Sequence, residues 1–308
     1  MKGVVYKSTG SWYVVRDEQG RFWNARMKGL FKIDDISSTN PVAVGDRVGM
    51  EVDNADGGTA LITEIGNRRN YINRQSPRGK HQQHIVAANL DQSLLLATLR
   101  EPRTSQGFID RFLVASEMYH VPSIIVVNKT DIYGKKEHQQ LDNWTSMYGA
   151  VGYSVFPLSV RNNTGIEPLM HVLKEKTTLI SGHSGVGKSS LLNALLPDLN
   201  LRTQDVSGWS GKGLHTTTFA EMFELPGGGR IIDTPGIKEF GLLGLSRQEL
   251  SHYFPEMRDR LGECQFNNCL HVNEPGCRIK EAVEQGDIHE NRYISYVNIL
   301  DSIVDKNY

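Results

Sequence analysis

The chain has 308 residues, with 34 lysines and arginines against 35 aspartates and glutamates, which gives a formal charge of −1. At about 100–200 residues per domain, this length predicts two or three domains. Apolar residues make up 39% and charged residues 22%, which excludes the disordered and collagen-like classes. Apolar runs are shorter than the ~18 residues of a membrane span and no signal peptide is evident, so we expect a soluble cytoplasmic protein with no membrane partner.

Residues 1–66 have the pattern of a small β-domain. Short apolar or alternating segments occur at residues 3–6, 12–16, 21–25, 47–52 and 60–65, with turn residues between them. About five short strands in this length predict a small barrel, and the oligonucleotide-binding (OB) fold is the leading candidate, although a sandwich or an SH3-like barrel would give a similar pattern.

A basic stretch follows the predicted barrel. It contains Arg68, Arg69, Arg74, Arg78 and Lys80, with no acidic residue among them. Such a stretch can contact phosphate backbones, and it can equally be a solvated linker.

From about residue 86 to 245, strands and helices alternate. We expect strands at 93–99, 122–127, 151–158 and 177–180, helices around 108–115, 166–173 and after Lys188, and a hairpin formed by 219–225 and 230–233. Repeated βα units predict a mainly parallel sheet with helices on both faces. The remaining segment, to residue 308, is predicted to be helical at 247–253 and 291–304.

The sharpest motif lies at residues 182–189, which match the phosphate loop G-x-x-x-x-G-K-[ST] between a predicted strand and a predicted helix. The glycines let backbone N–H groups converge on a phosphate, Lys188 can bridge the β- and γ-phosphates, and the Ser189 hydroxyl can bind Mg²⁺. We expect the phosphates to be held by Gly182, His183, Ser184, Gly185, Val186, Gly187, Lys188, Ser189 and Ser190.

A second motif predicts that the base is guanine. The sequence N-K-x-D, formed by Asn128, Lys129, Thr130 and Asp131, directly follows a predicted strand. The Asp131 carboxylate can accept hydrogen bonds from the N1–H and 2-amino groups of guanine, whereas adenine would leave it unpaired. Ser159 and Val160, further along the chain, are candidates for a loop behind the base.

Two further segments have the character of switch loops. In the sequence D-T-P-G, Asp233 can bind Mg²⁺ through water, and the N–H of Gly236 can sense the γ-phosphate. Upstream, residues 211–218 offer threonine hydroxyls, of which we select Thr217 as a Mg²⁺ ligand; the alternative is that these threonines begin a β-strand. Ile237 stands where Ras-like enzymes have a water-orienting glutamine, so intrinsic hydrolysis should be slow. His215 is the best candidate to position or activate water, and a surface or partner-contacting histidine is the alternative.

The order of these motifs is permuted. Ras-like GTPases run from phosphate loop to switch threonine, D-x-x-G and N-K-x-D, whereas here N-K-x-D comes first. The cyclic order is preserved, so we expect a circularly permuted domain with unchanged site geometry.

All three cysteines lie in one cluster, Cys264-x₄-Cys269-x-His271-x₅-Cys277. Three thiolates and one imidazole fit a closed tetrahedral Zn²⁺ site, which we expect to be structural because no ligand position stays open.

With these motifs the chain resembles the ribosome small-subunit-dependent GTPases, a family of circularly permuted GTPases of bacterial small-subunit assembly. The resemblance covers nearly the whole chain, with one departure at Leu214, where a basic residue commonly precedes the histidine. It implies an OB-type RNA-binding barrel at 1–80, a permuted GTPase domain at 81–245 and a mainly helical zinc-binding domain at 246–308. It also implies hydrolysis of GTP to GDP, stimulated by the small subunit and its rRNA, in late subunit maturation; we expect a monomer.

A protein of another class would share most of these features. The alternative is a GTP-gated RNA- or ribosome-binding scaffold with negligible hydrolysis, which Ile237 keeps open. A metabolic kinase with a phosphate loop is poorly supported, because N-K-x-D and D-T-P-G have no role there.

Overall fold

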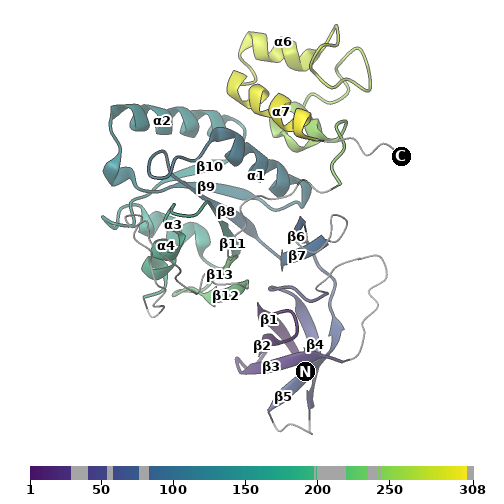
Figure 1. The fold of residues 1–308 in the computed structure, drawn as a ribbon, viewed down its shortest axis with the longest axis vertical. Coiled ribbons are helices and arrows are strands. Elements are labelled where there is room, and N and C mark those ends of the chain that lie inside the picture. The colour runs from purple at the N-terminus through teal and green to yellow at the C-terminus, as the bar shows by residue number, and fades with distance from the viewer. Residues whose placement is uncertain are drawn as a thin grey trace, which may run out of the picture.

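The computed structural model describes residues 1–28, 41–53, 58–75, 83–197, 199, 220–234, 242 and 244–303. The described residues form a β-barrel, a sheet covered by helices, and a helical C-terminal region, stacked along the long axis of the molecule (Figure 1). None of the helices in these ranges combines the length and the apolar character needed to cross a membrane.

All five strands predicted for the N-terminal region are present. They are β1 (Lys2–Ser8), β2 (Tyr13–Asp17), β3 (Phe22–Met27), β4 (Arg47–Asp53) and β5 (Thr59–Ile65). Pairing runs β1-β2-β3-β5-β4 and returns to β1, with only β3 and β5 parallel, so the sheet closes into a barrel. Alternate residues such as Val5, Val15 and Ile62 fill its interior, which is what the two-residue period of the sequence predicts.

A hairpin that the sequence analysis did not anticipate connects the barrel to the next region. It consists of β6 (Tyr71–Gln75) and β7 (Gln83–Ala88), and it straddles residue 80, where we had placed the end of the barrel region. The hairpin contacts the barrel through a bridge between Val44 and Ala87.

The central region is a mainly parallel sheet, as expected. Its strands are β8 (Gln92–Ala97), β9 (Ser123–Val127), β10 (Ser154–Pro157), β11 (Thr177–Ser181), β12 (Glu221–Glu224) and β13 (Arg230–Asp233). The order is β10-β9-β8-β11-β13-β12, and only β12 is antiparallel to its neighbour β13, with which it forms the predicted hairpin.

Helices cover both faces of this sheet (Figure 1). One face carries α1 (Gln106–Met118) and α2 (Lys135–Ala150), and the other carries α3 (Ile166–Leu173) and α4 (Lys188–Leu195); a short turn, η1 (Thr130–Ile132), follows β9. Buried residues of β8 alternate between the two layers: Leu95 packs in the cluster that includes α1 and α2, and Leu96 in the cluster that includes α3 and α4. Strands buried on both faces are continuous apolar runs, which explains the sequence of β8 and β9.

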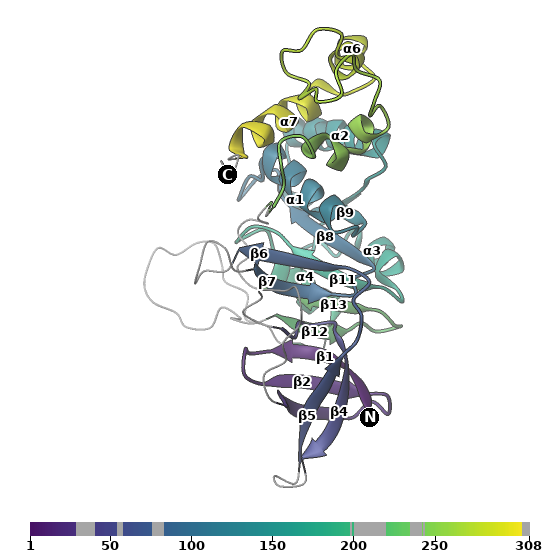
Figure 2. The same cartoon turned by 90° about the vertical axis from the view of Figure 1, so that its right-hand side faces the viewer.

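The two sheets are joined edge to edge. Strand β1 of the barrel pairs antiparallel with β12, with Lys7 opposite Glu221, so one eleven-stranded sheet runs through both regions. The turned view shows β12 lying directly beside β1 (Figure 2).

The C-terminal region packs on α1. It contains η2 (Leu250–Tyr253), α5 (Pro255–Arg258), α6 (Arg278–Gln285) and α7 (Glu290–Ser302). Arg292 of α7 is buried and contacts Asp110 of α1 at 2.6 Å and Glu256 of α5 at 2.7 Å. The same guanidinium lies 4.6 Å from the centre of the Phe254 ring.

Some element bounds differ from the prediction. The strand expected at 151–158 begins only at Ser154, because Gly152, with φ +92°, turns the chain after α2. Of the helix expected at 247–253, only Leu250–Tyr253 forms, as a 3₁₀ turn. Helices α2, α5 and α6 were not predicted.

Candidate nucleotide-binding site and metal centre

The predicted nucleotide motifs lie together at one edge of the central sheet. Asn128 follows β9, the phosphate loop follows β11, Asp233 ends β13, and Ser159 lies just after β10. The four strands are parallel, so their carboxyl ends share an edge, where ligands of open α/β sheets bind.

The phosphate loop has the backbone that its glycines permit. Gly182, Gly185 and Gly187 all have positive φ. A Cβ at Gly182 would lie 2.4 Å from the Leu96 carbonyl oxygen, and one at Gly187 would lie 2.5 Å from the Asn128 amide nitrogen. Close packing as well as backbone conformation therefore requires glycine at both positions. Helix α4 begins at Lys188, so its N-terminus faces the loop.

Lys188 folds back over this loop. Its Nζ donates to the carbonyl oxygens of Gly182, at 2.5 Å, and His183, at 3.0 Å. Burial lowers the pKa of the Lys188 ammonium group, and the negative charge of Asp233 opposes that shift. The cation is thus placed inside the loop, where phosphate oxygens can replace the carbonyls.

Asn128 connects three loops. It is 3% exposed, its Nδ2 donates to the Val186 carbonyl of the phosphate loop at 2.9 Å, and its Oδ1 accepts from the Val160 N–H at 3.2 Å. A single side chain therefore joins the N-K-x-D loop to the phosphate loop and to the loop after β10.

The other residues of the N-K-x-D motif are arranged around the same loops. Asp131 is exposed, and its Oδ1 accepts from the Ser159 hydroxyl at 2.6 Å. Lys129 has a left-handed backbone, with φ +67°, and its Nζ donates to the Glu101 carbonyl. Thr130 donates through its N–H and its hydroxyl to the Leu158 carbonyl. Asp131 thus keeps acceptor capacity for a base.

Asp233 is suited to bind a cation. Its Oδ1 is buried and has no hydrogen-bond partner among the described residues. Burial raises the pKa of this carboxyl, while the nearby Lys188 lowers it. An orphaned buried carboxylate oxygen beside a phosphate loop fits a water-coordinated Mg²⁺, with the Ser189 hydroxyl as a second candidate ligand.

Several predicted site residues lie outside the described part of the chain. These are His215, Thr217 and Gly236, together with Ile237 and the rest of segment 211–218. Their predicted roles remain predictions.

The four predicted zinc ligands come together. The ligand atoms of Cys264, Cys269, His271 and Cys277 all lie within 4.8 Å of one another. His271 Nδ1 is 3.6 Å from Cys264 Sγ and 3.4 Å from Cys277 Sγ, and these two sulfurs are 4.0 Å apart. A tetrahedral Zn²⁺ with Zn–S bonds of about 2.3 Å and Zn–N bonds of about 2.0 Å requires ligand separations of about 3.5–3.8 Å.

The surroundings of this cluster also favour a cation. Burial, with the neighbouring thiols adding to it, raises the pKa of Cys269 to about 12, so a bound metal ion is needed to hold the sulfur as a thiolate. The ligand loop is fixed by Glu274, which accepts from the N–H groups of Leu270, Val272 and Asn273. The donor set and its spacing fit a structural Zn²⁺ site.

Sequence reasoning missed supporting residues of the nucleotide site. The Phe108 ring of α1 lies against the His183 ring in a tilted arrangement, with centroids 3.6 Å apart. The Tyr133 hydroxyl donates to the Asn128 carbonyl at 2.5 Å and accepts from the Leu99 N–H at 2.8 Å, and burial raises its pKa to about 12. Neither residue belongs to a motif; Tyr133 could have been suspected only from its position two residues after Asp131.

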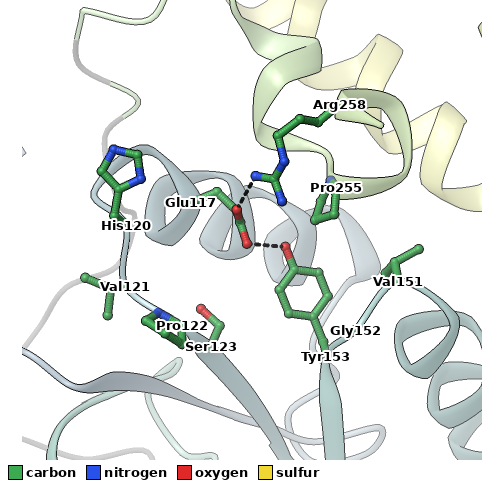
Figure 3. A pocket seen from close by; sticks show the side chains of 10 residues that line it. All are labelled: Glu117, His120, Val121, Pro122, Ser123, Val151, Gly152, Tyr153, Pro255 and Arg258. Atoms are coloured by element: carbon green, nitrogen blue, oxygen red, sulfur yellow. Dashed lines mark hydrogen bonds and ion pairs between the residues drawn. The ribbon is translucent and has the colours of Figure 1, made fainter. Parts of the chain in front are cut away.

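A cavity of about 370 Å³ lies away from this site, against the C-terminal region. Figure 3 shows Glu117 of α1 between Arg258 of α5 and Tyr153, which it contacts at 2.8 and 3.0 Å. Tyr153 and Ser123 lie where β10 and β9 begin, so the cavity is at the opposite end of the strands. The Glu117 carboxylate in this cavity is already paired with Arg258 and Tyr153. We therefore assign the cavity to the junction between α1 and the C-terminal region.

Comparison with known proteins agrees with this geometry. Residues 65–243 match the family model described as RsgA GTPase, and residues 2–60 match the RsgA N-terminal domain. The chain is 48% identical over 308 residues to small ribosomal subunit biogenesis GTPase RsgA 2 of Bacteroides thetaiotaomicron, covering 100% of this chain and 99% of that protein. The chain belongs to the RsgA GTPase family.

Other members of the RsgA family extend the similarity to solved structures. RsgA of Bacteroides fragilis is 47% identical over 308 residues, covering 99% of that protein. The crystal structure of YjeQ from Thermotoga maritima matches with a TM-score of 0.81 at 33% identity over 99% of both chains. YloQ, described as a circularly permuted GTPase, matches with a TM-score of 0.76 at 29% identity over 100% of this chain and 96% of that chain. The permuted GTPase fold, preceded by a barrel, is therefore confirmed.

Proposed function

We propose that this protein hydrolyses GTP to GDP and phosphate, that the small ribosomal subunit stimulates the reaction, and that it acts in late maturation of that subunit. The observation that carries the nucleotide assignment is the position of Asn128, which joins the guanine motif to the phosphate loop. The biological assignment is supported by relatives over the full chain length whose names describe small-subunit biogenesis GTPases.

In this proposal each motif has one task. Asp131 reads guanine, Lys188 and the loop amides hold the β- and γ-phosphates, and Ser189, Thr217 and Asp233 hold Mg²⁺, which neutralises charge on the phosphates when bound. Gly236 senses the γ-phosphate, and His215 positions the attacking water in place of the glutamine that Ile237 replaces. Slow hydrolysis that a partner accelerates is the expected behaviour.

The flanking regions would supply the partner contacts. We assign RNA binding to the barrel region, residues 1–80, and a second contact to the zinc-binding region, residues 246–308, on either side of the GTPase region, residues 81–245. A monomer in the cytoplasm, where subunits are assembled, suits this role. RNA would be held mainly by its shape and phosphates.

The test is steady-state GTP hydrolysis by the zinc-loaded protein, alone and with small subunits, large subunits or bulk RNA. We expect strong stimulation by small subunits only, which is lost in Lys188→Ala and weakened in His215→Ala. A slow rate that no particle changes would instead support the scaffold that binds GTP without turning it over.

A further inference from the structure

A row of three charged side chains crosses the seam between the barrel and the central sheet, which is the pairing of β1 with β12. Lys7 of β1 is opposite Glu221 of β12, and Glu221 is opposite Asp233 of β13, with both strand pairs antiparallel. Directly opposite residues in antiparallel strands point to the same face, with Cβ atoms about 4.5–5.5 Å apart. The three side chains therefore share one face of the continuous sheet.

Within this row, Glu221 interacts with Lys7 on one side and with Asp233 on the other. Lys7 Nζ lies 2.9 Å from Glu221 Oε2, with side chains that are 35% and 29% exposed. The pKa of Asp233 is raised mainly by burial, and the negative charge of Glu221 also raises it, which places the two carboxylates within electrostatic reach. Glu221 thus stands between a cation of the barrel and the carboxylate that we assign to Mg²⁺.

The row also lies between the two predicted switch segments. Glu221 opens β12, shortly after segment 211–218, and Asp233 closes β13, where D-T-P-G begins. A change at the barrel seam can therefore reach Asp233 through one strand pair.

We propose that Glu221 is a positioning residue for the magnesium site and that the barrel controls its effective charge through Lys7. With Lys7 in contact, the charge of Glu221 is largely neutralised. If RNA draws the barrel away, the carboxylate is uncovered beside Asp233 and attracts the divalent cation more strongly. This inference rests on the proposed function, since it requires a guanine nucleotide and Mg²⁺ at the site.

The chain supplies a matched control on the same seam. Glu224, three residues along β12, accepts from Tyr6 and Arg16 of the barrel and is opposite Arg230 rather than Asp233. Three positions along a strand place its side chain on the other face of the sheet. Substitutions at Arg16 and Glu224 therefore loosen the same seam without changing charge beside Asp233.

The experiment measures how Mg²⁺ slows release of a fluorescent GDP analogue from the full-length protein. Glu221→Gln should raise the Mg²⁺ concentration for half-maximal effect by about fivefold, because a negative charge is lost, and Lys7→Gln should lower it by about threefold. In the double variant, this Mg²⁺ concentration should lie within about twofold of its value in the unsubstituted protein. The same is expected for Glu221→Asp, Arg16→Gln and Glu224→Gln.

Shifts of opposite sign in the two single variants support the proposal, because mere loosening of the seam would move both in the same direction. The proposal would be overturned if Glu221→Gln showed the same Mg²⁺ dependence as the unsubstituted protein. It would also be overturned if the Arg16 and Glu224 controls shifted the Mg²⁺ dependence as much as the Lys7 and Glu221 variants do. Either result would leave the GTPase assignment intact. Failure of the unsubstituted protein to bind the GDP analogue would overturn both.

Discussion

At the scale of single residues, the site depends on side chains that join loops. Asn128 satisfies the Val186 carbonyl and the Val160 N–H from a position that is 3% exposed. Its amide nitrogen donates to one loop and its amide oxygen accepts from the other, so one side chain supplies both the donor and the acceptor that these contacts need.

We expect Asn128→Ala to weaken GDP binding by about 10- to 100-fold, because unpaired buried polar groups cost about 1–3 kcal/mol each. Titration with a fluorescent GDP analogue measures this. Asn143→Ala, at an exposed position on α2, is the control and should bind normally. Equal affinity in the two variants would show that Asn128 does not hold the loops together.

Residue roles could be predicted from sequence where chemistry is local to a motif. The glycines and Lys188 of the phosphate loop and the four zinc ligands could be named, because their spacing alone brings them together. Phe108 could not, because its contact with His183 joins residues 75 positions apart through helix packing. The same holds for Glu221, whose partners Lys7 and Asp233 come from other strands.

At the scale of elements, α7 is fixed to α1 by a buried ion-pair network. Arg292 is paired with Asp110 and Glu256, and the Tyr148 hydroxyl also donates to Asp110 at 3.0 Å. Arg111 of α1 adds a bond of 2.6 Å to Ser302 at the end of α7. The C-terminal region is thereby held against the helix whose first turn contacts the phosphate loop.

Replacing the buried arginine should destabilise this junction. Arg292→Met leaves two acidic side chains buried without their cation, and we expect a loss of about 3–5 kcal/mol in the free energy of unfolding. Arg278→Met, which breaks the exposed pair with Glu281, should cost less than about 1 kcal/mol. Urea denaturation followed by tryptophan fluorescence compares them, and equal midpoints would contradict the network's role.

Element prediction succeeded where periodicity is strong. Helix α3 has the predicted bounds, because its apolar residues keep helical spacing throughout. Helix α2 escaped prediction because only Leu141, Trp144, Met147 and Tyr148 of its sixteen residues are buried. The hairpin β6–β7 escaped because charged and polar residues interrupt its apolar pattern, and its pairing becomes visible only against the barrel.

At the scale of the whole molecule, we expect metal binding by the cluster of Cys264, Cys269, His271 and Cys277 to determine whether the C-terminal region folds. Helix α7 is attached to the loop that carries the ligands, because the Tyr293 and Tyr296 hydroxyls of this helix donate to the carbonyls of His271 and Leu270 at 2.8 and 2.9 Å. Small metal-bound regions commonly owe most of their folding free energy to the metal.

Metal removal should therefore unfold this region selectively. We expect about one zinc per chain by atomic absorption, and loss of the helical signal of α6 and α7 in circular dichroism after chelation under reducing conditions. GDP binding should persist, and added zinc should restore the helices. A chain that purifies from zinc-containing medium without zinc, and that keeps its helices under chelation, would contradict a structural zinc site.

The strand order of the central sheet has a consequence for synthesis on the ribosome. Strands β8, β9 and β10 are consecutive in the chain and adjacent in the sheet, so this half can form from local contacts as it emerges. Strand β11 then adds beside β8 and brings the phosphate loop to Asn128, which leaves the ribosomal exit tunnel earlier in synthesis. The permuted chain thus makes the base-reading half before the phosphate-holding half, so a nascent molecule has no complete GTP site until its last core strand arrives.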